Sequence, residues 1–156
     1  MRIISGNFKG KKFFLPEDKN TRPLRDMVKE SIFNPLQHSK KIHLNIENSV
    51  ILDLFSGSGS FGIECISRRA KKVFFVENYS KAFKILKKNV ANFNIIDQCF
   101  VLNEDCFKIN LYEKYLTKKL DIIFLDPPYK EKRTYNIIET IKKKKFFKKK
   151  RNYYSP

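Results

Sequence analysis

The fold of this chain is decided by residues 50–62, which read VILDLFSGSGSFG. The first five residues form an apolar run interrupted only by Asp53, and such a run is typical of a strand buried on both faces of a sheet. Glycines 57, 59 and 62 then follow in the spacing G-x-G-x-x-G, which lets the backbone turn sharply into a helix and approach a ligand closely. The stretch therefore predicts a strand, a glycine loop and a helix.

Strand and helix patterns alternate along the rest of the chain. We predict further strands over residues 73–77, 100–102 and 122–125, separated by helices near 80–93 and 111–116 and followed by a helix over 134–142. This alternation predicts an α/β fold with a doubly wound, mostly parallel sheet. We expect residues 41–145 to form this core and residues 146–156 to form a basic, irregular tail.

An N-terminal extension, residues 1–40, precedes the core. Residues 2–4 and 11–15 read as the two arms of a β-hairpin, with a turn near Gly6. A helix is expected to open at Thr21-Arg22-Pro23 and to close at Pro35. Its buried face is predicted from the apolar spacing of Leu24, Met27, Val28 and Ile32.

Composition narrows the class of protein. A chain of 156 residues is long enough for one core, and it contains neither a signal-peptide pattern nor an apolar run that could span a membrane, so we expect a cytoplasmic monomer. Its three cysteines and two histidines lack the spacing of a disulfide framework or a metal site. The net charge of +17 favours a polyanionic partner, although A/T-rich codons would also raise the lysine count.

Acidic residues after successive strands indicate what the glycine loop binds. Glu77 lies twenty positions after Gly57, where a carboxylate can accept both hydrogen bonds of a ribose diol. Asp53 suits a cationic ligand such as the sulfonium amino acid of S-adenosylmethionine, and it would repel a pyrophosphate. Asp105, with the Cys106 backbone beside it, is positioned to accept a hydrogen bond from an adenine amino group.

The fourth predicted strand runs into Asp126-Pro127-Pro128-Tyr129. Two prolines hold the backbone extended, so that the Asp carboxylate and a proline carbonyl can both accept hydrogen bonds from one NH2 group. An exocyclic amine is a poor nucleophile, and two acceptors would favour the geometry that frees its lone pair for attack on a methyl group. Tyr129 offers a face for stacking an extruded base.

With these motifs the chain resembles the class I methyltransferases, which have a Rossmann-like fold, and in particular the RsmD-type 16S rRNA guanine-N2 methyltransferases. The resemblance covers about residues 1–145. It includes RIISGNFKG at residues 2–10, residues 22–34 with Arg22-Pro23, Asp26, Glu30 and Phe33-Asn34, and both motifs described above. Leu24 and Tyr79 depart from the family pattern.

The resemblance implies methyl transfer from S-adenosylmethionine to N2 of a guanine in the 16S rRNA of an assembling small ribosomal subunit. It implies a catalytic segment formed by Asp126, Pro127, Pro128 and Tyr129. It also implies a cofactor site lined by Asp53, Phe55, Gly57, Gly59, Glu77, Asp105 and Cys106, and RNA contacts from Arg2, Lys9, Arg22 and Arg25.

The C-terminal end departs most from the family, whose members add strands after the last predicted helix. We therefore expect the C-terminal strands to be missing from this chain. Lysine runs correspond to A-rich codons, and Asn152 to Ser155 would read Ile-Ile-Ile-Leu in the next frame with A/T-biased codons. We hypothesise a frame slip in this tract.

Two other functions remain open from the residues. A DNA adenine-N6 methyltransferase would use a similar tetrapeptide, although such enzymes more often have Asn in place of Asp126. A non-catalytic RNA-binding remnant would be compatible with missing C-terminal strands.

Overall fold

The structure is a computed structural model that describes residues 1–17, 26–38, 45–108, 120–128 and 131–143. Within these residues, four strands form one parallel sheet: β1 (Val50–Leu54), β2 (Lys72–Val76), β3 (Cys99–Leu102) and β4 (Ile122–Leu125). Their spatial order is β3-β2-β1-β4, so the chain moves outward from β1 in one direction and then crosses to its other side. This reversal is the point at which open α/β sheets bind their ligands.

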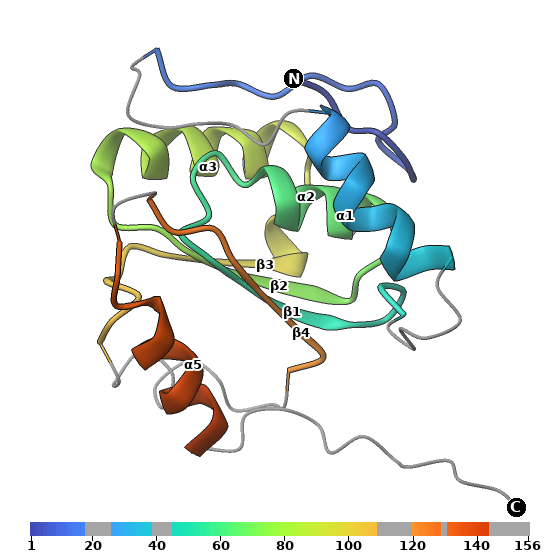
Figure 1. Cartoon of the computed structure of the whole chain (residues 1–156). Coiled ribbons are helices and arrows are strands. Elements are labelled where there is room, and N and C mark those ends of the chain that lie inside the picture. Colours follow the sequence, from blue (N-terminus) through green and yellow to red (C-terminus); the bar gives the residue numbers. More distant parts are fainter. Residues whose placement is uncertain (18–25, 39–44, 109–119, 129–130, 144–156) are drawn as a thin grey trace, which may run out of the picture.

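Helices cover both faces of the sheet (Figure 1). On one face lie α1 (Asp26–His38), α2 (Ser60–Ser67) and α3 (Ser80–Asn92), followed by the short 3-10 helix η1 (Ile96–Gln98), and on the other face lies α5 (Thr134–Lys143). The predicted α/β fold with a parallel sheet is confirmed, and the predicted strands agree with the observed ones to within one residue at each end. The helix expected near residues 111–116 and the basic tail lie outside the described residues.

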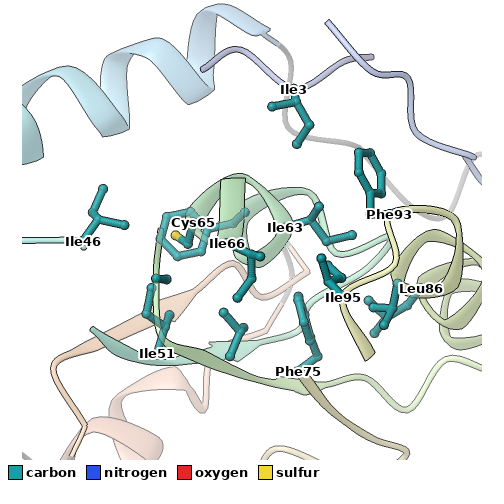
Figure 2. Close-up of a cluster of buried hydrophobic side chains, with 14 of the residues drawn as sticks. Ile3, Ile46, Ile51, Ile63, Cys65, Ile66, Phe75, Leu86, Phe93 and Ile95 are labelled. Carbon is teal, nitrogen blue, oxygen red and sulfur yellow. The ribbon is translucent and has the colours of Figure 1, made fainter. Parts of the chain in front are cut away.

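Successive side chains along the strands point to opposite faces of the sheet, and the core therefore consists of two clusters. Ile51, Val73 and Phe75 point toward α2 and α3, whereas Leu52 and Phe74 point toward α5. This is the expected result for strands whose side chains alternate between faces. Figure 2 shows the first cluster, in which side chains from the sheet meet Ile63 and Ile66 of α2 and Leu86 of α3.

The N-terminal segment, residues 1–16, closes this first cluster from above. Ile3 and Phe13 are buried in it. The predicted hairpin forms only as a short pairing: Arg2 and Lys12 make an isolated antiparallel bridge, and the Ile3 amide donates to the Lys11 carbonyl at 2.9 Å and the Phe13 amide to the Met1 carbonyl at 3.3 Å. Gly6 lies so close to the Ser67 carbonyl oxygen that an added Cβ atom would be 1.9 Å from it, so the turn packs against α2 instead of extending into strands.

The predicted buried face of α1 is wrong for Met27 and Val28, whereas Ile32 is partly buried and packs against the first core cluster. Met27 is 82% exposed and Val28 is 42% exposed, whereas Lys29 and Phe33 are fully buried. Lys29 points inward because the buried Glu64 carboxylate of α2 lies 3.8 Å from its ammonium group, and Phe33 stacks on Phe61 with 5.2 Å between ring centroids. Apolar spacing could not reveal an inward position whose favourable partner is a charge. Leu24 lies outside the described residues.

Pro35 was predicted to end this helix, but α1 continues to His38. Proline in a helix interior removes one backbone hydrogen bond. Only three helical residues follow Pro35 and its ring is exposed, so the break in hydrogen bonding falls in the last turn, where helices are least constrained.

No helix in the described part of the chain is long and apolar enough to cross a bilayer.

Candidate active site

The loops that follow the four parallel strands meet at one edge of the sheet. Asp53 of β1 lies opposite Phe75 of β2 and Phe124 of β4, so the segments after β1, β2 and β4 emerge side by side. Most of the residues predicted to bind the cofactor, together with Asp126, lie in or directly after these strands. The tertiary structure thereby brings together residues that are more than seventy positions apart in the sequence.

The glycine loop after β1 is held in a single conformation by its neighbours. Gly59 has a φ of +84°, and a Cβ atom there would lie 2.5 Å from Leu86 Cδ1 of α3. Ser56 Oγ donates to the Asp53 carbonyl at 2.6 Å and accepts the Val76 amide at 3.0 Å, which fastens the loop to both β1 and β2. A left-handed backbone and a close approach both require glycine at position 59.

Phe55 and Gly57 also have left-handed backbones in this loop, with φ values of +57° and +56°. A non-glycine residue in this conformation is uncommon and is often found at functional sites. The half-buried ring of Phe55 lies against Phe107, with 5.7 Å between centroids.

Glu77 lies directly after β2 and is buried beside the glycine loop. One of its carboxylate oxygens accepts the Gly57 amide at 2.8 Å, and the other accepts the Tyr79 amide at 2.7 Å. The carboxylate is therefore fixed by two backbone donors. Since an ionised carboxylate has about four lone-pair positions, acceptor capacity remains for a ligand.

Asp53 is almost fully buried and its carboxylate accepts the Gly62 amide in the first turn of α2 at 3.0 Å. Burial raises the pKa of this carboxyl group to about 8, and the charges of Asp126 and Glu77 add to the increase, while the Gly62 hydrogen bond opposes it. Asp53 lies in β1, between β2, which Glu77 follows, and β4, which Asp126 follows, so the three carboxyl groups lie at one edge of the sheet. Like charges close together favour protonation of the most buried group.

Asp105 and Cys106 lie in the turn after β3. Asp105 is half-buried and its side chain accepts the Phe107 amide at 2.9 Å, which shapes the turn. Cys106 is buried, with its thiol 4.0 Å from the Val76 carbonyl oxygen, and burial raises the pKa of that thiol to about 12. The turn contacts β2 through Cys106 and the glycine loop through Phe107.

Sequence reasoning missed two residues at this edge, Phe107 and Arg133. The Arg133 guanidinium lies 4.0 Å from the centroid of the Phe107 ring, and Glu131 pairs with it at 2.8 Å. Phe107 follows the predicted Asp105-Cys106 directly, so its position next to a candidate site was the available clue. Arg133 could not be found in this way because it comes from the segment before α5.

Asp126 follows β4 and is exposed, although partial desolvation raises the pKa of its carboxyl group. Its own amide lies 3.5 Å from the Leu54 carbonyl oxygen, at the end of the β1–β4 pairing. The Pro128 carbonyl accepts the Glu131 amide at 2.8 Å and therefore already has a local hydrogen-bond donor. The Pro127 carbonyl accepts no backbone hydrogen bond within the described ranges. Tyr129 lies outside them.

Two of the four predicted RNA-contacting residues are described. Arg2 is exposed and pairs with Asp26 at 3.4 Å, and Lys9 is exposed on the N-terminal segment. Arg22 and Arg25 lie outside the described residues.

Residues 1–17, 26–38, 45–108, 120–128 and 131–143 contain no cluster of side chains that could hold a metal ion.

Comparison with known proteins identifies the family. Residues 1–154 match the family described as Conserved hypothetical protein 95. The chain is 38% identical to ribosomal RNA small subunit methyltransferase D of Buchnera aphidicola subsp. Acyrthosiphon pisum over 94% of this chain and 72% of that protein. It is 37% identical to the protein of the same name from Haemophilus influenzae, over 83% of this chain and 64% of that protein.

The fold of the chain is also similar to that of a solved structure. A putative methyltransferase from Escherichia coli superposes with a TM-score of 0.71 and 28% identity, over 90% of this chain and 71% of that chain. The Rossmann-like methyltransferase fold and the resemblance seen in the sequence motifs are thereby confirmed. The chain belongs to the Conserved hypothetical protein 95 family, as do the ribosomal RNA small subunit methyltransferases D.

Proposed function

We propose that this chain transfers a methyl group from S-adenosylmethionine to the exocyclic N2 of a guanine in 16S rRNA of the small ribosomal subunit. The observation that carries the proposal is the position of Asp126-Pro127 directly after β4, beside Asp53 of β1 and the glycine loop that follows β1. Relatives of which this chain spans 72% and 64% are named ribosomal RNA small subunit methyltransferases.

The residues after β1, β2 and β3 fit S-adenosylmethionine by their chemistry. Glu77, held by two backbone amides, would accept hydrogen bonds from the ribose hydroxyls. The Asp105 turn, bordered by Phe55 and Phe107, would take the adenine. When bound, the cofactor supplies a methyl group on a positively charged sulfonium centre.

Asp53 would complement that positive charge. Its carboxyl group is buried among acidic neighbours in the free protein, which is why its pKa is raised to about 8. A cation close to it would favour the ionised form and relieve the repulsion from Asp126 and Glu77. The residue would also keep the start of α2 in place through the Gly62 amide.

Asp126 and the Pro127 carbonyl would hold the amino group of the base. Both are acceptors, and the Pro127 oxygen has no competing backbone donor in the described part of the chain. Two acceptors orient both N–H bonds of the amine and direct its lone pair toward the methyl group, which is catalysis by positioning and electrostatics. The raised pKa of Asp126 is expected to fall when the amine's hydrogens approach its carboxylate.

The test is methyl transfer from labelled S-adenosylmethionine to small subunits that lack the modification, using the full chain. Asp126→Ala should lower the rate about 100-fold or more, because it removes one of two acceptors for the reacting group. Asp97→Ala, an exposed acidic residue in η1, is the matched control and should leave the rate unchanged. S-adenosylhomocysteine binding by both variants would show that the cofactor site is intact.

The outcomes separate the alternatives. Transfer to guanine N2 with loss in Asp126→Ala supports the proposal. Transfer to adenine in DNA and not to the subunit would replace it with a DNA adenine methyltransferase. RNA binding without transfer to any substrate would identify a non-catalytic RNA-binding protein.

A further inference from the structure

One face of α3 carries only positive charge. Lys81, Lys84 and Lys88 recur at the spacing i, i+3, i+7, which places them on one side of the helix, and all three are exposed. We call these three residues the α3 basic face. The buried residues of the helix, among them Leu86 and Val90, lie on the opposite side. The lysines are therefore turned away from the core.

This arrangement costs helix stability. The sequence of α3 contains no acidic residue, so no i,i+4 pair of opposite charge forms within it. Lys81 stands in the first turn, where the helix dipole disfavours a cation, and Lys84 and Lys88 are like charges at i,i+4. Neither Lys84 nor Lys88 forms an ion pair with a described residue. A polyanion bound along this face would remove the repulsion.

The α3 basic face is continuous with the N-terminal segment. The Lys88 ammonium lies 3.8 Å from the centroid of the Phe14 ring. The next residue, Asn89, is buried and bonds both the Phe14 amide, at 2.8 Å, and the Phe14 carbonyl, at 3.0 Å. Figure 1 shows the N-terminal segment running along α3 on the side away from the sheet.

Exposed cations of the N-terminal segment therefore extend the α3 basic face. Lys9, Lys11 and Lys12 are exposed there. Asn89 also donates to the Ser58 carbonyl of the glycine loop at 2.8 Å. One buried side chain of α3 therefore bonds both the N-terminal segment and the glycine loop of the candidate active site.

The first turn of α3 points toward that site. Ser80 comes three residues after Glu77, so Lys81 and Lys84 lie near the edge where the loops meet. Asp126 follows β4, two strands away from β2 in the sheet order, which corresponds to roughly 10 Å at the usual strand spacing. The RNA strand on either side of a base held at Asp126 would therefore lie near the first turn of α3.

We propose that the α3 basic face, together with Lys9, Lys11 and Lys12, binds the phosphate backbone of the RNA that carries the target base. The identity of this RNA rests on the proposed function, whereas the binding surface rests on the charges and contacts of α3 and the N-terminal segment. Phosphate contacts of this kind set orientation and not sequence preference.

The test is binding of a 16S rRNA fragment to the full chain over a range of salt concentrations. The variant Lys84→Gln/Lys88→Gln removes two charges but keeps good helix formers. The matched control is Lys142→Gln/Lys143→Gln, which removes two exposed charges from α5 on the other face of the sheet. The slope of log K against log salt should become shallower by about 1.4–1.8 in the α3 variant, since each lost contact contributes about 0.7–0.9.

The α3 variant should be at least as thermally stable as the natural chain, because it loses the repulsion between Lys84 and Lys88, and it should keep the S-adenosylhomocysteine affinity, because neither lysine belongs to the candidate cofactor site. An equal slope in the α3 and α5 variants, or no RNA binding by the natural chain, would overturn the proposal. If the natural chain binds RNA with the predicted change of slope but transfers no methyl group, the proposed function fails while the surface stands. If the natural chain transfers methyl groups and the α3 variant has the same slope of log K against log salt as the natural chain, the proposed binding surface is wrong while the proposed function stands.

Discussion

At the residue scale, the candidate site depends on side chains that hold the backbone as much as on those that face a ligand. Asp53 and Glu77 are buried, and their carboxylates accept backbone amides from Gly62 and Gly57, respectively. Glu77 therefore fixes the loop between β1 and α2, and Asp53 fixes the first turn of α2. A buried carboxylate with a backbone donor is both a conformational restraint and a titrating group.

Asp53 should make stability depend on pH. Its pKa rises from 3.8 to about 8 on folding, so the folded protein binds one more proton than the unfolded chain between these values. Stability is then largest below about pH 4 as far as this group is concerned, and it falls as the pH rises toward 8. Asp53→Asn should flatten the fall between pH 5 and pH 8, measured as the difference in urea midpoint between the two proteins. A constant difference across this range would contradict the raised pKa.

A comparison of Gly59 with Gly10 separates steric overlap at the glycine loop from the cost of a left-handed backbone. Their φ values are +84° and +85°, but a Cβ atom at Gly59 would lie 2.5 Å from Leu86, whereas at Gly10 it would meet nothing within 4 Å. Gly10→Ala should cost about 1–2 kcal/mol for the left-handed backbone alone. Gly59→Ala should cost about 1–3 kcal/mol more because of the steric overlap. Equal losses in urea unfolding would show that the packing of α3 on the loop is not tight.

At the scale of elements, a buried charge cluster joins α1, α2 and the N-terminal segment. Glu64 of α2 has no exposed surface and accepts the Ile4 and Ser5 amides at 2.9 and 3.0 Å. Arg68 donates to it at 3.0 Å, and the Lys29 ammonium is 3.8 Å away. Burial lowers the pKa of Lys29, and the charges of Glu64 and Asp26 oppose this shift. Three elements thus depend on one carboxylate.

Removing that carboxylate should destabilise the fold strongly. Glu64→Ala leaves the Ile4 and Ser5 amides without their acceptor and removes one of the two carboxylates that pair with the buried Lys29, and breaking a buried ion pair costs about 3–5 kcal/mol. The control is Glu47→Ala, which breaks an exposed pair with Arg69 at 3.5 Å and should cost about 1 kcal/mol or less. Urea unfolding measures both.

Glu64→Gln keeps an acceptor for the amides and should fall between these two values, which preserves the test if the alanine variant does not fold. If Glu64→Ala and Glu47→Ala lose the same stability, the cluster does not hold the N-terminal segment.

At the scale of the whole molecule, the formal net charge of +17 is spread over a chain of 156 residues. The chain has 33 lysine and arginine residues against 16 aspartate and glutamate residues, so even where local pairs such as Arg133 with Glu131 and Lys142 with Glu139 form, 17 positive charges have no acidic counterpart. Uncompensated like charges destabilise a compact state and favour association with a polyanion.

Salt should consequently stabilise the free protein. Raising NaCl from about 10 mM to about 150 mM shortens the screening length from roughly 30 Å to roughly 8 Å and weakens the repulsion. We expect the melting temperature to increase over this range, measured by circular dichroism at pH 7. The Lys84→Gln/Lys88→Gln variant should show a smaller increase. A melting temperature that falls with added NaCl would mean that attractive ion pairs outweigh the repulsion.

The sequence by itself determined the strands of the parallel sheet, the glycine loop and the family, because strand periodicity, glycine spacing and the motifs at residues 2–10 and 126–129 are local patterns. Only the tertiary structure decided which face of α1 is buried, since Lys29 turns inward toward a carboxylate thirty-five positions away. It also decided that Asn89 joins Phe14 to Ser58, and that Arg133 lies on Phe107. Local patterns report propensity and burial, whereas a buried polar group is stabilised by partners that only the folded chain brings within reach.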